Sequence, residues 1–464
     1  MTKRRLTAVL PIVLAISVAA CGGTPGQDKP KQSSGGTPAD QVKTSGFESL
    51  GPVTLRVISG EGSSGPRQAL QRLTDEFERK YPNVTVRLSF RDTASWFKQA
   101  KLVAASDNPP DVFAGNQGYQ VDGELVKAGL ILPLDEYAKA YGWDTSFSPE
   151  TLQQFKWSDD GTRFGEGTLW GVAQSGQSTG VFANMAKLRQ AGIDPASLKT
   201  FDDFDAALAK LRRELPRDEP VIALGNKDQY GAIHLWGMIQ GAYTPAQDMR
   251  DWIFHKDGAT FDTPGNLRSL EKLKQWADDG YMGPGDAFNS RNDAEAAAAF
   301  ARGEGAFMLG GNWNASIAKD GLGKNAAFFD MPPGESGKRV AIGSASLPMH
   351  IAAKTKYADL AAAYLDQIAG PDAGQALVAT QQVPAATDAS AKPTDPLGRE
   401  VDTGWKELVQ DGGLTLFPDW SSPTMLQTMG QTFQEMLAGR TSPQDVIDRT
   451  QSDWEEYHSE LEAS

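Results

Sequence analysis

Hydrophobic and polar positions along the first part of the chain follow the periods of strands and helices in turn. Short apolar runs are typical of buried strands, and between two of them Leu70, Leu73 and Phe77 recur on one helical face. Alternating strands and helices predict a largely parallel sheet covered by helices, which is an α/β fold. The predicted elements are strands at 53–59, 84–90 and 111–114 and helices at 66–80 and 95–106.

Amphipathic helices continue through the rest of the chain. Thr200 precedes one of them as a predicted N-cap, and Gly129, Gly280 and Gly303 follow the ends of three others, where glycine favours the backbone that stops a helix. With 464 residues, the chain is long enough for two large lobes, each with its own core. These further predicted helices are 123–128, 201–214, 266–279, 293–301 and 357–369.

The start of the chain has the pattern of an export signal. Three basic residues precede an apolar stretch, 6–20, that is too short to span a bilayer. The tetrapeptide VAAC, which ends at the only cysteine, Cys21, resembles the lipobox of bacterial lipoproteins, where the signal is cut before an acylated cysteine. We expect a signal peptide at 1–20, a lipid anchor on Cys21, a flexible tether at 21–46 and a location on the outer face of the cell membrane. An ordinary secretory signal with an incidental cysteine is the alternative, and it also places the protein outside the cytoplasm.

The net charge and the composition of the chain disfavour several classes of binding partner. The formal net charge is −14, and loss of the basic signal makes it more negative, which disfavours nucleic acid and anionic membrane surfaces. With only four histidines and one cysteine, the composition disfavours the usual zinc clusters, so we expect no metal. After the signal no apolar segment approaches transmembrane length, so the lipid anchor is the expected membrane contact.

A glycine pattern after the first predicted strand matches the spacing of a dinucleotide loop. Gly60, Gly62 and Gly65 have the G-x-G-x-x-G spacing, but the acidic residue needed about twenty positions later is missing, because Asp92 lies too far along. We therefore expect no cofactor. The loop still ends a strand of an open α/β sheet, and that edge normally faces the ligand.

Three stretches carry a resemblance to a known family. Residues 107–137, 181–212 and 299–317 resemble segments of extracellular solute-binding proteins of ABC importers, family 1, the maltose-binding-protein-like family. The resemblance implies a two-lobe, type II periplasmic-binding-protein-like fold, each lobe a sheet flanked by helices, joined by a hinge of crossing strands. It also implies a monomer that performs no catalysis and delivers a solute to the transmembrane subunits of an ABC permease.

By the family pattern, the chain passes between the lobes three times. The expected crossings lie near 173–180, 340–346 and 390–400. Gly176, Gly180 and Gly343 there are candidates to absorb hinge rotation, with tight turns as the alternative. The expected lobes are 47–175 with 346–390, and 176–345 with 391–464.

Polar candidates for ligand binding stand in the loops after the predicted strands and at the crossings. A carboxylate there can accept hydrogen bonds from two sugar hydroxyls. For Asp92 and Ser95 the alternative is a role in capping the helix that begins there. The candidates are Glu61, Ser63, Ser64, Asp92, Ser95, Asn116 and Gln117 from the strand ends and Ser178 and Ser344 from the crossings.

Tryptophans are the aromatic candidates, because sugars stack on aromatic planes. Trp313 lies between two glycines and Asn314, in a turn, which favours a ligand platform over core packing. For Trp236 and Trp420, ligand contact and ordinary packing stay open. Trp96 is predicted to pack in the core beside its neighbour. A carbohydrate, a di- or oligosaccharide, is the favoured solute, with a polyamine, an amino acid or a glycerol phosphate as alternatives.

One short motif offers an enzymatic alternative. The sequence GQSTG matches G-x-S-x-G, which would make Ser178 the nucleophile of an exported serine hydrolase. A nucleophile elbow needs a strand, a sharp turn and then a helix, whereas the residues after Ser178 have the pattern of another strand. We therefore expect a binding protein and no enzyme.

Overall fold

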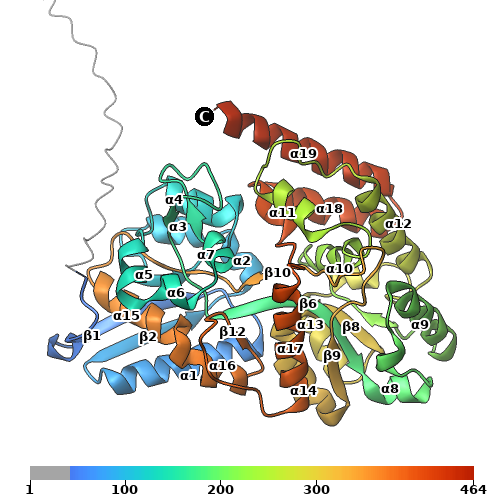
Figure 1. Cartoon of the computed structure of the whole chain (residues 1–464), viewed down its shortest axis with the longest axis horizontal. Helices are drawn as coiled ribbons and strands as arrows, with labels where there is room; N and C mark the ends of the chain where they lie inside the picture. The colour runs from blue at the N-terminus through green and yellow to red at the C-terminus, as the bar shows by residue number, and fades with distance from the viewer. Residues whose placement is uncertain (1–41, 464) are drawn as a thin grey trace, which may run out of the picture. The chain divides into compact units, whose positions relative to one another are not determined.

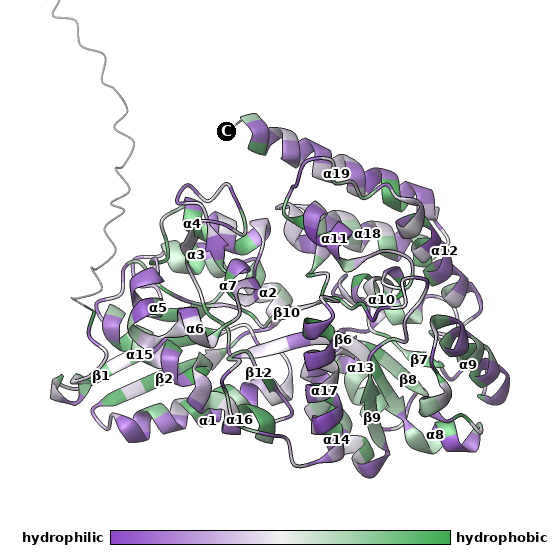
Figure 2. Ribbon diagram, in the orientation of Figure 1, coloured by the Kyte–Doolittle hydropathy of each residue, from purple (hydrophilic) through white to green (hydrophobic). Residues whose placement is uncertain are grey.

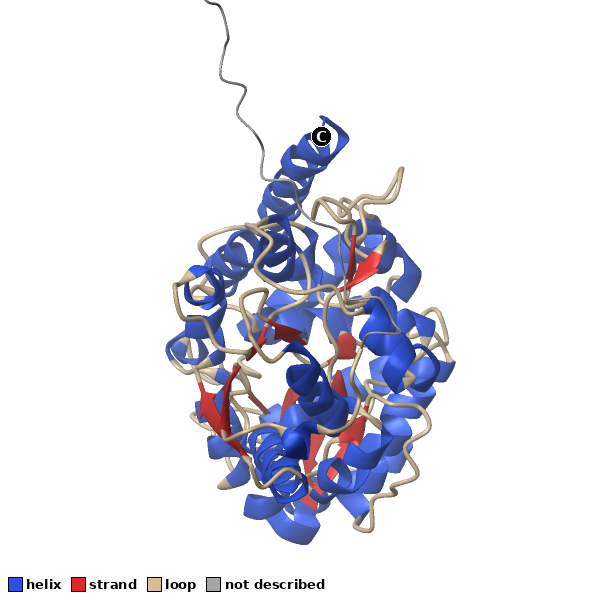
Figure 3. Ribbon diagram, turned by 90° about the vertical axis from the view of Figure 1, so that its left-hand side faces the viewer, coloured by secondary structure: helices blue, strands red, loops and turns tan. Residues whose placement is uncertain are grey.

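The computed structural model describes residues 42–463. The predicted signal, Cys21 and most of the tether lie outside the described residues. Within 42–463, no helix is both long enough and apolar enough to cross a membrane. Helices surround the strands on the outside (Figure 3), and the expected α/β fold with two lobes is confirmed.

The first lobe is built on a sheet with the strand order β11-β3-β1-β2. β1 pairs in parallel with both β2 and β3, whereas β11 runs antiparallel to β3. Parallel pairing brings the carboxyl ends of three strands to one edge of the sheet. The strands are β1 (Val53–Ser59), β2 (Val84–Phe90), β3 (Val112–Ala114) and β11 (Met349–Ile351).

Helix α1 (Ser64–Lys80) shows why these elements pack together. Leu70, Leu73 and Phe77 are buried, as their spacing predicts, and the helix packs against two helices from late in the chain. The helices of this lobe are α1, α2 (Thr93–Phe97), α3 (Ala100–Ala105), α4 (Glu124–Lys127), α5 (Asp135–Tyr141), α6 (Trp143–Ser146), α7 (Pro149–Gln153), α15 (Ala358–Ala369) and α16 (Gly374–Ala379). A two-stranded ribbon, β4 (Lys156–Trp157) with β5 (Thr168–Leu169), completes it.

The second sheet has the order β10-β6-β8-β7, with β9 and β12 also paired to β6. The first half of β6 pairs with β10 and β12, and its second half pairs with β8 and β9. β6 therefore runs from the middle of the molecule into the second lobe (Figure 1). The strands are β6 (Ser175–Asn184), β7 (Ile222–Ala223), β8 (Phe307–Gly311), β9 (Ala326–Phe329), β10 (Gly343–Ala345) and β12 (Val383–Pro384).

Helices cover this second sheet and extend beyond it. Hydrophobic strands such as β8 and β9 contrast with the hydrophilic outer turns of α17 and α19 (Figure 2). Capping boxes at Thr200 and Asn292 begin α9 and α13. The helices are α8 (Met185–Gln190), α9 (Phe201–Glu214), α10 (Gly231–Gln240), α11 (Ala246–Ile253), α12 (Pro264–Asp278), α13 (Asp293–Ala301), α14 (Ala315–Leu322), α17 (Pro396–Gln410), α18 (Met425–Leu437) and α19 (Pro443–Ala463).

The prediction of a single helix at 95–106 is wrong. Two helices, α2 and α3, stand there, because the Gln99 N–H donates to the Trp96 carbonyl at 2.8 Å, three residues back, and interrupts the α-helical ladder. The predicted core role of Trp96 is confirmed. Its side chain is buried, and its Nε1 donates to the carbonyl of Ala114 at 2.7 Å.

The three glycines at the predicted crossings do not form tight turns. None of Gly176, Gly180 and Gly343 has a positive φ among the described residues, and all three lie in strands. A Cβ on any of them would overlap a neighbour: Trp405 for Gly176, Phe328 for Gly180 and Leu414 for Gly343. These glycines allow close packing against the strands.

Candidate functional site

A pocket lies where the carboxyl ends of the three parallel strands of the first sheet face loops of the second lobe. Each strand is followed by polar side chains that line it. Glu61 and Ser63 follow β1, and Asp92 and Thr93 follow β2. Asn116 and Gln117 follow β3. The parallel order of the sheet therefore gathers these side chains on one side of the pocket.

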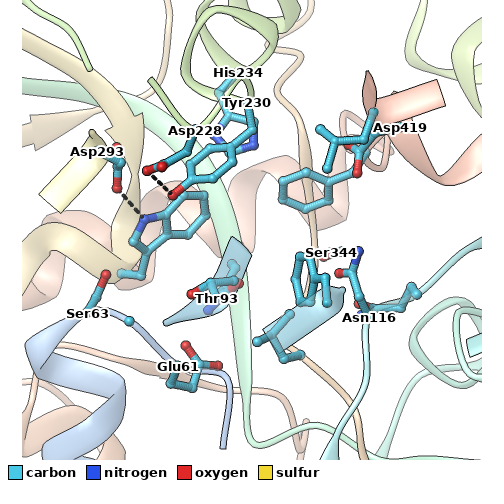
Figure 4. Close-up of a pocket in the computed structure, with 18 of the residues that line it drawn as sticks. Glu61, Ser63, Thr93, Asn116, Asp228, Tyr230, His234, Asp293, Ser344 and Asp419 are labelled. Carbon is cyan, nitrogen blue, oxygen red and sulfur yellow. Dashed lines mark hydrogen bonds between the residues drawn. The ribbon is translucent and has the colours of Figure 1, made fainter. Parts of the chain in front are cut away.

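The second lobe supplies the opposite side. Asp228, Tyr230 and His234 come from the loop before α10 and its first turn, and Asp293 begins α13. Figure 4 shows this group across the pocket from Glu61, Ser63 and Thr93. Trp313 stands directly after β8. Residues from two sheets thus share one pocket.

Aromatic rings form a continuous wall on the second-lobe side. The ring of His234 lies 5.6 Å from Trp313, 5.3 Å from Tyr230 and 5.4 Å from Phe417, measured between centroids. Phe417 in turn lies 5.2 Å from Trp420. Gly311 has no side chain where the Trp313 indole lies, and a Cβ there would overlap the ring. The absent side chain lets the indole lie over the backbone at the end of β8.

Hydrogen bonds hold several of these side chains in place. Trp313 Nε1 and Asn314 Nδ2 donate to the Asp293 carboxylate at 3.4 and 3.2 Å. The Tyr230 hydroxyl donates to Asp228 at 3.3 Å (Figure 4). Ser63 Oγ donates to Asn314 Oδ1 at 3.5 Å, so a contact spans the two sides. The carboxylates therefore anchor the aromatic wall as well as facing the pocket.

Five carboxylates line the pocket: Glu61, Asp92, Asp228, Asp293 and Asp419. Burial raises the pKa of Glu61 to about 7 and that of Asp419 to about 6. Burial also raises the pKa of Asp228 and of Asp293, and the charge of a neighbouring aspartate adds to each shift. The five acids therefore give the pocket a negative charge, although Glu61 is only about half ionised at pH 7.

His234 does not offset that charge at neutral pH. Burial lowers its pKa to about 4, so the imidazole is neutral at pH 7. Among the described residues that line the pocket, none is a lysine or an arginine.

A buried pair behind the pocket fixes the loop after β3. The Asp122 carboxylate accepts from the Asn116 N–H at 2.9 Å and is bonded to His350 Nε2 at 3.0 Å. Gln117 Nε2 donates to the carbonyls of Ala345 and Ser346 at 3.0 and 3.1 Å. Asn116 is therefore held by the buried Asp122, and Gln117 is held by the end of β10 and the residue after it.

Most of the sequence-predicted site residues line the pocket. Asp92 does so while also capping α2, where the Ser95 N–H donates to its carboxylate at 2.9 Å. Asp92 therefore both faces the pocket and caps a helix, so its position fits both alternatives, ligand binding and helix capping. The predicted residues that line the pocket are Glu61, Ser63, Asp92, Asn116, Gln117, Trp313, Ser344 and Trp420.

Four predicted residues lie outside the pocket. Ser64 is the first residue of α1, and Ser95 contributes its N–H to the helix cap. Trp236 packs in the core of the second lobe, where its Nε1 donates to Ser269 Oγ at 2.7 Å. Ser178 is buried within β6.

The position of Ser178 does not fit a nucleophile elbow. β6 continues through it from Ser175 to Asn184 without a turn, and the helix α8 begins only afterwards. Its Oγ is buried and forms no hydrogen bond with any described residue. The strand–turn–helix geometry that the motif requires is therefore absent from this part of the described chain.

Several pocket residues were missed by the sequence analysis. In the segment that begins α10, residue type alone favours Trp236 as a sugar contact, whereas Tyr230 and His234 face the pocket. The helical period separates His234 from Trp236 by about 200°, so the two side chains lie on opposite faces of α10. Asp228, Asp293, Phe417 and Asp419 carry no local signal of this kind.

Among the described residues, no group of three or more His, Cys, Asp or Glu side chains is arranged to hold a metal ion. The carboxylates of the pocket therefore do not form a set of metal ligands among the described residues. They can accept hydrogen bonds from an organic solute.

Comparison with known proteins agrees with this architecture. The sequence profile described as bacterial extracellular solute-binding protein matches residues 62–375. An uncharacterized ABC transporter extracellular-binding protein of Pyrococcus horikoshii is 24% identical over 407 residues, covering 86% of this chain and 84% of the relative.

Solved structures share the fold. A chitin oligosaccharide binding protein aligns with a TM-score of 0.74 and 22% identity, over 88% of this chain and 99% of the other. A structure from work on xylan utilization by Caldanaerobius polysaccharolyticus aligns with a TM-score of 0.72 and 21% identity, over 86% and 99%.

Proposed function

This chain belongs to the family of bacterial extracellular solute-binding proteins, and we propose that it captures a carbohydrate, a di- or oligosaccharide, for a membrane permease of the ABC type. The observation that carries the proposal is the aromatic wall of Trp313, Tyr230, Phe417 and Trp420, which faces polar side chains at the strand ends. Sugars present C–H faces that stack on aromatic rings and hydroxyls that pair with carboxylates and amides. The pocket offers both.

The solutes of similar proteins support a sugar. The aligned structures include a protein described as binding chitin oligosaccharide and one from work on xylan utilization. A partner permease is supported by the P. horikoshii relative, which is described as an ABC transporter extracellular-binding protein.

Capture proceeds by closure of the lobes over the solute. Three chain segments run side by side where the lobes join: the first half of β6, β10 and β12. We propose that the hinge lies in these segments, with β12 a few residues before the third crossing that the family pattern predicts near 390–400. A ligand that touches both sides of the pocket favours the closed state by its extra contacts there.

The protein acts without a cofactor and without catalysis, as a monomer. It is held at the outer face of the membrane by a lipid on Cys21, through the tether at 21–46. The lipobox-like tetrapeptide that ends at this cysteine supports the anchor.

A thermal-shift screen followed by calorimetry tests the proposal. The purified protein is screened against di- and oligosaccharides, amino acids, polyamines and glycerol phosphates. Binding at a hundredfold excess over Kd stabilises the native state by about 2.7 kcal/mol, so a specific sugar class should raise Tm clearly. A response to a non-sugar class alone would overturn the proposal.

Two aromatic variants locate the site. Trp313→Ala should weaken binding of the responding sugar by about tenfold or more, from the loss of stacking. Tyr357→Ala is the control, because Tyr357 is a half-buried aromatic residue just before α15, outside the pocket and outside the hinge strands. Equal effects of the two variants would contradict the placement of the site.

A further inference from the structure

The charged side chains that line the pocket indicate more about the solute than the shape of the pocket does. Glu61, Asp92, Asp228, Asp293 and Asp419 face one space, and no lysine or arginine is among the described residues lining it. A buried carboxylate without a positive partner is costly, and sugar hydroxyls donate hydrogen bonds without neutralising its charge. A neutral ligand would leave the ionised acids uncompensated and would leave Glu61 partly protonated, whereas a positive group beside Glu61 would stabilise its ionised form.

Glu61 is the clearest unpartnered group. Its side chain is only 9% exposed, and its carboxylate points into the pocket (Figure 4). No described residue donates a hydrogen bond to this carboxylate or forms an ion pair with it, since the bond at this residue, to Ser59 Oγ, is made by its backbone N–H. A nearly buried acid that faces an open pocket and lacks any partner is suited to bind a group of the ligand.

Carboxylates from both lobes also converge around Tyr230. The hydroxyl of Tyr230 donates to Asp228, and after burial the charges of Asp293, Asp228 and Asp92 are what raise its pKa well above the ordinary value. Asp92 belongs to the first lobe, whereas Asp228 and Asp293 belong to the second. Like charges that face one another across the pocket repel, and a positive group between them would relieve this repulsion.

Resting on the proposed function, we propose that the solute is an amino sugar, a di- or oligosaccharide that carries at least one free protonated amine, with Glu61 as the carboxylate that pairs with the amine. Asp92, Asp228 and Asp293 supply the surrounding negative potential. The aromatic wall stacks on the sugar rings and selects a sugar over a linear amine. A charge-assisted pair inside this pocket is stronger than a neutral hydrogen bond at the same place.

The test compares sugars that differ only at the nitrogen. Calorimetry at pH 7 measures Kd for β-1,4-linked glucosamine oligomers, for their N-acetylated counterparts and for the matching glucose oligomers, with galactosamine oligomers as a second series. We expect the free-amine oligomers of one series to bind at least tenfold more tightly than both neutral counterparts. Equal or tighter binding of the neutral sugars would overturn the amine proposal while leaving the carbohydrate function intact.

A charge-neutral variant assigns the effect to Glu61. Glu61→Gln should abolish most of the amine preference, with no loss of Tm, because it removes a buried charge that lacks a partner. Glu456→Gln, an exposed position on α19 outside the pocket, is the matched control and should retain the preference. An unchanged preference in Glu61→Gln would overturn the role of this residue.

Spermidine separates the two proposals. Binding of spermidine without binding of any sugar in the panel would overturn both the carbohydrate function and the amino-sugar inference. Binding of amino sugars without spermidine supports both.

Discussion

The ring of His350 is bonded at both of its nitrogens, to the Trp170 carbonyl through Nδ1 at 2.8 Å and to the Asp122 carboxylate through Nε2 at 3.0 Å. Both partners are acceptors, so an imidazolium that donates from both nitrogens satisfies this geometry. Both side chains of the pair are 1% exposed. The pair lies directly behind Asn116, whose N–H donates to the same Asp122 oxygen.

The first prediction concerns the stability of this pair. His350→Gln leaves Asp122 buried without its positive partner, and we expect a loss of roughly 3–5 kcal/mol in the free energy of unfolding. The double variant Asp122→Asn/His350→Gln should recover part of this loss, because the buried charge is gone. Urea denaturation measures both. A double variant less stable than the single one would contradict the ionic description.

The second prediction concerns the protonation of His350. Burial alone would lower its pKa, but the charge and hydrogen bond of Asp122, with the Trp170 carbonyl, raise it above the ordinary 6.5. The stability from this group is therefore fully present below pH 6.5 and is lost as the pH rises through the folded-state pKa.

Nitrogen NMR of the histidine rings checks this. At pH 6.5 His350 should be mostly doubly protonated, whereas His234 and His255, whose pKa values burial lowers to about 4, should be neutral. A neutral His350 at that pH would refute the assignment.

The third prediction uses a glycine that touches the pair. A Cβ at Gly115 would overlap both the Asp122 carboxylate and the His350 ring. Gly115→Ala should therefore lower Tm strongly and weaken sugar binding through Asn116. Gly129→Ala is the control, because a Cβ there meets nothing within 4 Å and only the φ of 63° is unfavourable, at a cost of about 1–2 kcal/mol. Similar losses in the two variants would argue against the close contact.

The fourth prediction separates the two roles of Asp92. Asp92→Ser retains a side-chain oxygen for the cap of α2 but removes the charge, so it should keep stability and lose affinity for the solute. Asp92→Ala removes both and should cost a further ~1 kcal/mol in the free energy of unfolding. Calorimetry and thermal melts measure the two effects. Full affinity in Asp92→Ser would limit this residue to the cap.

The fifth prediction concerns the proposed lipid anchor. Cys21→Ala removes the acylated side chain, so in cells the protein should move from the membrane fraction to the soluble extracytoplasmic fraction, while sugar binding is unchanged. Fractionation and immunoblotting measure this. A variant that still partitions with the membrane would contradict the anchor.

Local patterns explain why much of the fold could be predicted. The strand at 53–59 and the helix at 201–214 match the structure residue for residue. The apolar period of the strand and the capping box of the helix each involve only a few neighbouring residues, so both can be read from the local sequence. The break between α2 and α3 could not be predicted, because the bond from the Gln99 N–H to the Trp96 carbonyl that interrupts the helical ladder is not encoded in the apolar period.

The residues of the candidate site also fall into two groups, those that the sequence could indicate and those that it could not. Glu61, Asp92 and Asn116 follow three parallel strands of one sheet, and the strand–helix alternation in the sequence is enough to predict that they lie close together. Asp293 begins α13 and Asp419 lies in a short 3-10 helix (Pro418–Ser421), and the positions of both depend on how the second lobe packs. Their carboxylates become informative only once their burial and their neighbours are known.

The place of β11 in the first sheet governs the order in which the protein can fold. This strand pairs with β3 but is encoded after β6, β8 and β10 of the second sheet. The two helices that pack on α1, α15 and α16, come later still. During synthesis the first lobe therefore stays incomplete until the strands of the second have been made, and long-range pairing of this kind slows folding. Such a delay would keep a newly made chain of an exported protein unfolded for longer.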